Sequence, residues 1–289
     1  MTARITYYGV RGSTPTSGPG FEKFGGNTTC LFVETEKVKI VIDAGTGIRL
    51  LGLDLMTSEF GKGQGELNMM FTHTHWDHIQ GFPFFIPAYI PGNKIHIYGE
   101  EKAIRIKQEN GDEKEEAWNI ERTLYMQQTF MYFPASTANM AGNFEYHTIA
   151  GNQVLEFDGL TVKTLSMHHP NNTLGFRFDF ENGKSFTFCT DVEHVNKMDQ
   201  KIMEFAEGSE ALAYDSQYTP EEYEDGKIGW GHSTYIHGSQ IVKAGGIKEY
   251  HMIHHDPIHD DTFLSDLEAS AKKEFAKTLM VPEKYSFEI

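Results

Sequence analysis

Four residues of the types that bind metal ions fall within six positions, in the run His73-Thr74-His75-Trp76-Asp77-His78. The apolar residues before the run, 67–71, have the pattern of a buried strand. Because side chains two apart on a strand point to the same face, we expect His73 and His75 to converge on one point. Asp77 and His78 follow where the strand should turn and can address a second point nearby. Imidazole nitrogens and carboxylate oxygens are ordinary ligands for zinc and related divalent metals.

Short runs rich in Val, Ile, Phe and Tyr and bounded by Gly, Asn or Asp indicate strands. They cover 5–10, 30–33, 38–43, 67–72, 94–98, 162–167, 174–180, 185–190 and 211–214. Apolar residues at helical spacing indicate helices at about 45–58, 101–131, 196–207, 233–244 and 261–278. The last helix opens with Asp260 and Asp261, in a reasonable capping arrangement. Strands interleaved with helices predict an α/β or α+β protein in which helices cover the sheets.

The charge balance of the chain limits the kinds of molecule that it is expected to bind. The 289 residues include 25 Lys and Arg against 41 Asp and Glu, a net charge of −16. Tight binding of long nucleic acids depends on basic side chains that neutralise phosphates, so a long RNA or DNA substrate is disfavoured. A small anion is not disfavoured in this way, because local positive charge can attract it. Cys30 and Cys189 form neither a zinc spacing nor a disulfide framework, which suits a reducing cytoplasm.

Segment 100–147 differs from the rest of the chain. It is charged at 100–116 and then rich in Met, Phe and Tyr over 124–133. It separates two β-rich halves, and either a cap or a long surface helix fits this composition. Because no linker, repeat or low-complexity tract divides the chain, we expect one domain over 1–289 with a cap or insertion at about 100–147.

The run at 73–78, together with Val41-Ile42-Asp43-Ala44-Gly45 before it, resembles the metallo-β-lactamase superfamily. The resemblance implies an αββα sandwich, two mixed sheets covered by helices, with a dinuclear metal site between the sheet edges. It extends over nearly the whole chain, because the later metal positions of the family recur in order. Asp43 either orients the site, as the family's buried carboxylate does, or caps the helix that follows.

The resemblance also implies the remaining metal ligands. His169, followed by Pro170, matches the third histidine better than the adjacent His168, and Asp191 matches the bridging carboxylate. His254 matches the last histidine, with His255 as the alternative. The implied ligand set is His73, His75 and His169 for one metal, Asp77, His78 and His254 for the other, and Asp191 as the bridge.

A further motif indicates one branch of the superfamily. Gly229-Trp230-Gly231-His232-Ser233-Thr234 resembles the histidine motif of the transfer-RNA 3′-processing and cyclic-nucleotide phosphodiesterase branch. In that branch the histidine touches the scissile phosphate and can protonate the leaving oxygen, a role that suits a pKa near neutrality. The alternative is that His232 belongs to the cap of the next helix, where Ser233 would be the capping residue. The expected catalytic residues are Asp77 and His232.

These features predict a dinuclear metal phosphodiesterase that hydrolyses a small phosphodiester, with a 3′,5′-cyclic nucleotide converted to a linear monophosphate as the first hypothesis. Two metal ions lower the pKa of a shared water and stabilise phosphoryl oxygens. The alternatives are a ribonuclease, a thioester or lactone hydrolase on the same site, and a cyclic-nucleotide-binding protein without turnover.

The ligands are nitrogen and oxygen donors and fit Zn²⁺, with Mn²⁺ or Fe as alternatives. We expect a cytoplasmic protein with no membrane contact. Its partners are a small phosphodiester and, as relatives imply, a second copy in a homodimer.

Overall fold

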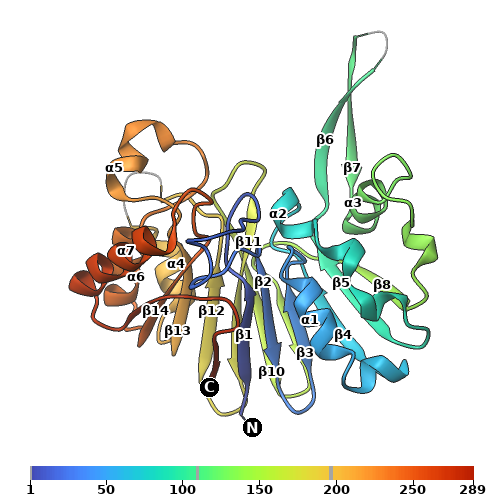
Figure 1. The fold of residues 1–289 in the computed structure, drawn as a ribbon, viewed down its shortest axis with the longest axis horizontal. Helices are drawn as coiled ribbons and strands as arrows, with labels where there is room; N and C mark the ends of the chain where they lie inside the picture. The colour runs from blue at the N-terminus through green and yellow to red at the C-terminus, as the bar shows by residue number, and fades with distance from the viewer. Residues whose placement is uncertain (1, 109–110, 195–197) are drawn as a thin grey trace.

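The computed structural model describes residues 2–108, 111–194 and 198–289. Two seven-stranded sheets pack face to face, and helices cover their outer faces (Figure 1). This arrangement confirms the predicted αββα class. The two chain ends lie side by side at the same edge of the sandwich, because the last strand pairs with the first.

The first sheet has the strand order β16-β1-β2-β3-β4-β5-β8. Pairing is antiparallel from β16 to β3 and parallel from β3 to β8, so the sheet is mixed. Its strands are β1 (Arg4–Gly9), β2 (Cys30–Glu34), β3 (Lys39–Ile42), β4 (Glu66–Met70), β5 (Lys94–Gly99), β8 (Asn143–Thr148) and β16 (Ser286–Glu288).

The second sheet has the order β15-β14-β13-β12-β11-β10-β9 and is also mixed. Its parallel half, β12 to β15, is joined through helices, as parallel strands require. Its strands are β9 (Val154–Phe157), β10 (Leu160–Met167), β11 (Thr173–Phe180), β12 (Ser185–Cys189), β13 (Ala211–Asp215), β14 (Glu249–Ile253) and β15 (Thr278–Met280).

Alternation along the strands divides the apolar side chains among three cores. One core fills the space between the sheets, and the second lies between the first sheet and helices α1 and α3. The third lies between the second sheet and helices α4, α6 and α7. The helices are α1 (Ile48–Leu55), α2 (Trp76–Ile79), α3 (Ile120–Gln127), α4 (Gln200–Ala206), α5 (Pro220–Glu222), α6 (Tyr235–Ala244) and α7 (Asp261–Glu274).

The predicted helix at 101–131 is wrong over most of its length. The chain instead forms a hairpin of β6 (Lys102–Lys107) and β7 (Glu113–Trp118), which projects away from the sandwich (Figure 1). Exposed and partly buried side chains alternate along β6, which is the period of two of a strand. Among the described residues of this window, only α3, near its end, is helical. The prediction of a single domain with an insertion at 100–147 stays a prediction.

Smaller differences concern element ends. Strand β4 ends at Met70, before the position expected, and α7 ends at Glu274. The expected cap of α7 is confirmed, because the Asp260 side chain accepts a hydrogen bond from the Phe263 amide. Part of the helix expected at 196–207 lies outside the described residues. Among those described, no helix combines the length and the apolar character needed to cross a membrane.

Candidate metal centre

The candidate ligands lie in the segments that follow β4, β10, β12 and β14. Left-handed backbone geometry occurs in the segments that follow β3, β12 and β14. Asp43, Asp191 and His254 have φ values of 62°, 52° and 62°. Non-glycine residues adopt this geometry at a cost, and it persists only where the surroundings enforce it. The local backbone is therefore strained at the positions where side chains must point inward.

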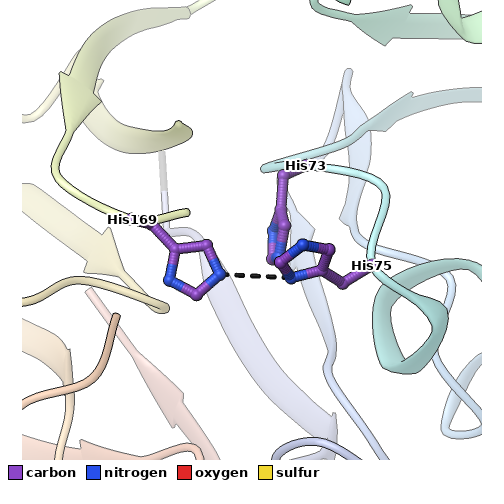
Figure 2. A group of neighbouring side chains, drawn as sticks. All are labelled: His73, His75 and His169. Atoms are coloured by element: carbon purple, nitrogen blue, oxygen red, sulfur yellow. Dashed lines mark hydrogen bonds between the residues drawn. The ribbon is translucent and has the colours of Figure 1, made fainter. Parts of the chain in front are cut away.

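One group of imidazoles contains His73, His75 and His169, with one ring nitrogen from each within 4.8 Å of the others (Figure 2). Nε2 of His169 lies 3.1 Å from Nδ1 of His75. His73 and His75 do not sit on a strand, as their spacing led us to expect. They follow β4 in a loop, and His75 directly precedes α2.

A second group contains Asp77, His78, Asp191 and His254, all buried and within 4.8 Å of one another through one atom each. Asp77 and His78 lie on the single turn of α2. Oδ2 of Asp77 is 3.2 Å from Nε2 of His78 and 3.2 Å from Nε2 of His254. The amide of Ser13 donates to the same oxygen and holds the carboxylate in place.

Asp191 lies between the two groups. Its Oδ1 is 3.9 Å from Nε2 of both His73 and His169. Its Oδ2 is 3.2 Å from Nε2 of both His78 and His254. Each carboxylate oxygen therefore faces a different group, which is the arrangement that a bridging ligand requires.

Most of the histidines are oriented through the nitrogen that faces away from the centre. Nδ1 of His78 donates to Asp43, Nδ1 of His169 to the carbonyl of Gly231, and Nδ1 of His254 to Gln217. Histidines that bind metals are held in this way, because the outer contact fixes both tautomer and ring orientation. Gly231 has φ of 90°, and a Cβ there would lie 2.2 Å from the His169 ring, so only glycine fits.

The donor set fits two divalent cations. Nε2 of His73 and Nε2 of His78 are buried and make no hydrogen bond within the described part of the chain. Burial lowers the pKa of His73 well below its usual value and that of His169 to about 4, so both rings are neutral and keep a lone pair. Burial also disfavours a charge on His254, but the carboxylate of Asp191 raises its pKa to about 9. A cation would replace the proton there.

A cavity of about 460 Å³ opens onto this centre, within the range that holds small-molecule ligands. His232 lines it, and Nδ1 of this ring donates to the buried carboxylate of Asp215 over 2.8 Å. Trp76, 60% exposed, offers an apolar ring at the same cavity. The lining residues are Ser13, Thr74, His75, Trp76, Asp77, Asp191, His232 and His254.

In each pair of adjacent histidines, one member belongs to the candidate metal centre and the other lies outside it. His168 is exposed while His169 points into the centre. His255 is buried elsewhere, where its Nε2 donates to the carbonyl of Val281, and His254 belongs to the second group.

Two capping interpretations are wrong. Asp43 does not cap α1, because Gly47 occupies that position, and its carboxylate instead accepts hydrogen bonds from Thr72 and His78. Ser233 does not cap α6, which begins after Thr234. Its hydroxyl contacts His194 and Tyr214.

Asp215, Gln217 and Trp76 were not predicted as site residues. Asp215 is the last residue of β13 and Gln217 follows the strand, and neither has a spacing that marks it. Trp76 stands inside the histidine run, where an exposed aromatic residue could have been noted.

An αββα sandwich defines a class of metal-binding folds when it carries two neighbouring groups of candidate ligands, one of histidines and one of histidines and aspartates, between its sheet edges. The model of the beta-lactamase superfamily domain matches residues 39–255, so this chain belongs to that superfamily. The match includes all the candidate ligands.

Ribonuclease Z of Haloarcula marismortui is 23% identical over 184 residues, which are 64% of this chain and 50% of that protein. The chain thus matches half the length of this relative. The metallo-beta-lactamase fold protein YhfI from Bacillus subtilis has a TM-score of 0.69 at 15% identity, covering 100% of this chain and 99% of the other. Human tRNase Z, short form, has a TM-score of 0.65 at 13% identity, covering 98% of both chains. These two likenesses show the fold.

Proposed function

We propose that this chain is a metal-dependent phosphodiesterase that acts on a small phosphodiester, with a 3′,5′-cyclic nucleotide as the first candidate substrate. The observation that carries the proposal is the pair of Asp215 and His232 at the edge of the cavity that opens onto the candidate ligands. A thioester hydrolase has less need of a positioned acid, because a thiolate departs more readily than a sugar alkoxide.

The ligand assignment is part of the proposal. His73, His75 and His169 hold one cation, Asp77, His78 and His254 hold the other, and Asp191 lies between them. Two divalent cations, when bound, supply a water of lowered pKa and neutralise charge on the phosphoryl oxygens. Zn²⁺ fits this donor set, and Mn²⁺ or Fe are the alternatives.

His232 acts as the general acid. Its Nδ1 is held by Asp215, which leaves Nε2 to carry the proton toward the cavity. In the hydrolysis the oxygen of one water bonds to phosphorus, and the bond from phosphorus to the sugar oxygen breaks. The departing oxygen takes the proton from Nε2, and the product is a linear monophosphate. The proton that the attacking water loses passes to solvent, and Nε2 takes up a proton from solvent before the next turnover.

The size and charge of the site favour a small substrate. A cavity of about 460 Å³ suits a mononucleotide, and the Trp76 ring offers a surface on which a base can stack. A net charge of −16 opposes a long polyanion. A ribonuclease is the second candidate, favoured by the match to Ribonuclease Z.

Product analysis after incubation of the zinc-loaded protein with defined substrates tests the proposal. The panel contains 3′,5′- and 2′,3′-cyclic mononucleotides, bis-p-nitrophenyl phosphate, a transfer-RNA precursor and an acyl thioester. We expect linear monophosphates from the cyclic nucleotides with the wild type and none with Asp77→Ala.

Cleavage of the RNA precursor alone would establish the ribonuclease. Turnover of the thioester alone would contradict phosphodiester chemistry. Binding of a cyclic nucleotide without turnover, in protein with both metals present, would indicate a binding protein.

A further inference from the structure

A separate group of metal-binding side chains lies on the first sheet. His96 on β5 and Glu145 and His147 on β8 each place one ligand atom within 4.8 Å of the others. None of them belongs to the candidate metal centre. The strands are parallel neighbours in which His96 stands opposite Glu145, and His147 is two residues further along on the same face. The register of two regular strands therefore brings the three side chains together.

His96 is oriented from both sides. Its Nδ1 lies 3.3 Å from Oε2 of Glu145, and its Nε2 lies 3.4 Å from Oε1 of Glu66 on β4. Histidines that bind metals use one ring nitrogen for the cation and donate the other N–H to a carboxylate or carbonyl. With Glu66 on the outer nitrogen, Nδ1 is left to face a cation shared with Glu145.

His147 supplies an independent observation. Its Nε2 is buried and has no hydrogen-bond partner among the described residues, although its neighbours hold the ring firmly. The ring stacks on Tyr98 with 4.5 Å between centroids and an angle of 18°. A buried nitrogen without a partner costs free energy, so such an atom calls for an explanation. A bound cation would account for it.

We propose that His96, Glu145 and His147 bind a third divalent transition-metal ion, with Glu66 as a positioning residue for His96. Two imidazoles and one carboxylate are a donor set that zinc accepts, with solvent completing the coordination. The imidazoles make calcium and magnesium poor occupants, since both prefer oxygen ligands. The exposed side chain of Glu145 leaves the site open to exchange with solvent.

The position of this site assigns it a structural role. Strand β5 ends at Gly99 and β8 begins at Asn143, so the projecting segment 100–142 leaves from one strand and returns to the other. Strand β8 is the last strand of the sheet and pairs only with β5 within the described residues. A cation bound across the two strands would hold this outermost strand to its neighbour β5.

Titration of metal-free protein with Zn²⁺, followed by zinc counting after removal of unbound metal, tests the proposal. We expect three Zn²⁺ per wild-type chain and two in the double variant His96→Ala, His147→Ala. The matched control is His168→Ala, which removes an exposed histidine outside both sites and should keep three. Equal zinc content in the wild type and the double variant would overturn the proposal. If that variant fails to fold, Glu145→Gln, which keeps the size of the side chain, provides the same comparison.

Two further measurements separate this site from the candidate metal centre. Glu66→Gln should weaken the third Zn²⁺ by about 10–100-fold, the loss typical of an outer contact to a ligating histidine. In the wild type, the third equivalent of Zn²⁺ should slow amide hydrogen exchange in β8. Unchanged exchange in β8 would contradict the structural role. In Asp191→Ala, which disrupts the other centre, the site on β5 and β8 should still bind one Zn²⁺.

Discussion

The candidate metal centre and the His96–Glu145–His147 site offer the same donor atoms but are built in different ways. The centre combines loops from both sheets, and three of its positions have left-handed backbone geometry. The site on β5 and β8 consists of side chains on two regular paired strands, and none of its three residues has a positive φ.

The two ways of building a site suit different roles. In the centre, outer contacts hold the rings of His78, His169 and His254. Four of the seven proposed ligands line a cavity that can admit a substrate. Enforced strain of this kind is typical of reactive sites. A site made only by strand register needs no strain, and it can serve to join two strands.

Loss of Asp191, the proposed bridging carboxylate, should give the largest effect. Asp191→Ala removes the oxygens that face both groups, so both cations should bind more than about 100-fold more weakly, beyond the loss typical of an outer contact. Hydrolysis of bis-p-nitrophenyl phosphate should disappear with them. Zinc counting and the activity assay check this together. Retention of three Zn²⁺ in this variant would contradict the role of Asp191.

Loss of His232, the proposed general acid, should affect turnover and leave the metals in place. His232→Ala should reduce kcat by about 10²–10⁴-fold, the usual contribution of a positioned general acid. The zinc content should stay at the wild-type value, because His232 is not in the proposed ligand set. Steady-state kinetics and zinc counting on the same preparation make the test. Metal loss equal to that of Asp191→Ala would show that His232 is a ligand and not the acid.

A change of one outer contact should be milder. In Asp43→Asn the amide replaces the carboxylate that accepts the proton of His78 Nδ1, and metal affinity should fall by about 10–100-fold. The left-handed backbone at this position tolerates asparagine, so the fold should be kept. Competition with a zinc chelator measures the affinity. A variant with wild-type affinity would show that the neutral contact suffices.

The parts of the centre that could be predicted from the sequence are those with a local signature. The run from His73 to His78 lies within one loop and one helical turn, so its spacing alone indicates convergence. Asp215 and Gln217 reach the centre only because β13 lies beside β12 and β14. The site of His96 and His147 could not be predicted from the sequence either. The two residues meet only because β5 pairs with β8, and a long segment separates these strands in the chain. The β6–β7 hairpin was missed because the spacing of the charged residues in this segment fits the period of a helix as well as that of a strand.

A pair of stacked histidines outside both sites provides the smallest test. His194 and His237 stack with 3.2 Å between ring centroids, and burial lowers the pKa of each to about 4. In the unfolded chain these groups titrate near 6.5, so between that pH and pH 4 the unfolded state binds more protons. The free energy of unfolding should therefore fall as the pH drops through this window.

The variant His237→Gln removes one of the two groups. Its unfolding should take up about one proton fewer, and stability should depend less steeply on pH. Urea unfolding of metal-free wild type and variant at pH 7 and pH 5 measures the difference. Above pH 6.5 the two slopes should agree, because both rings are then neutral in either state. An equally steep loss in both proteins would show that the pair is already protonated in the fold, and hence that burial does not keep these histidines neutral.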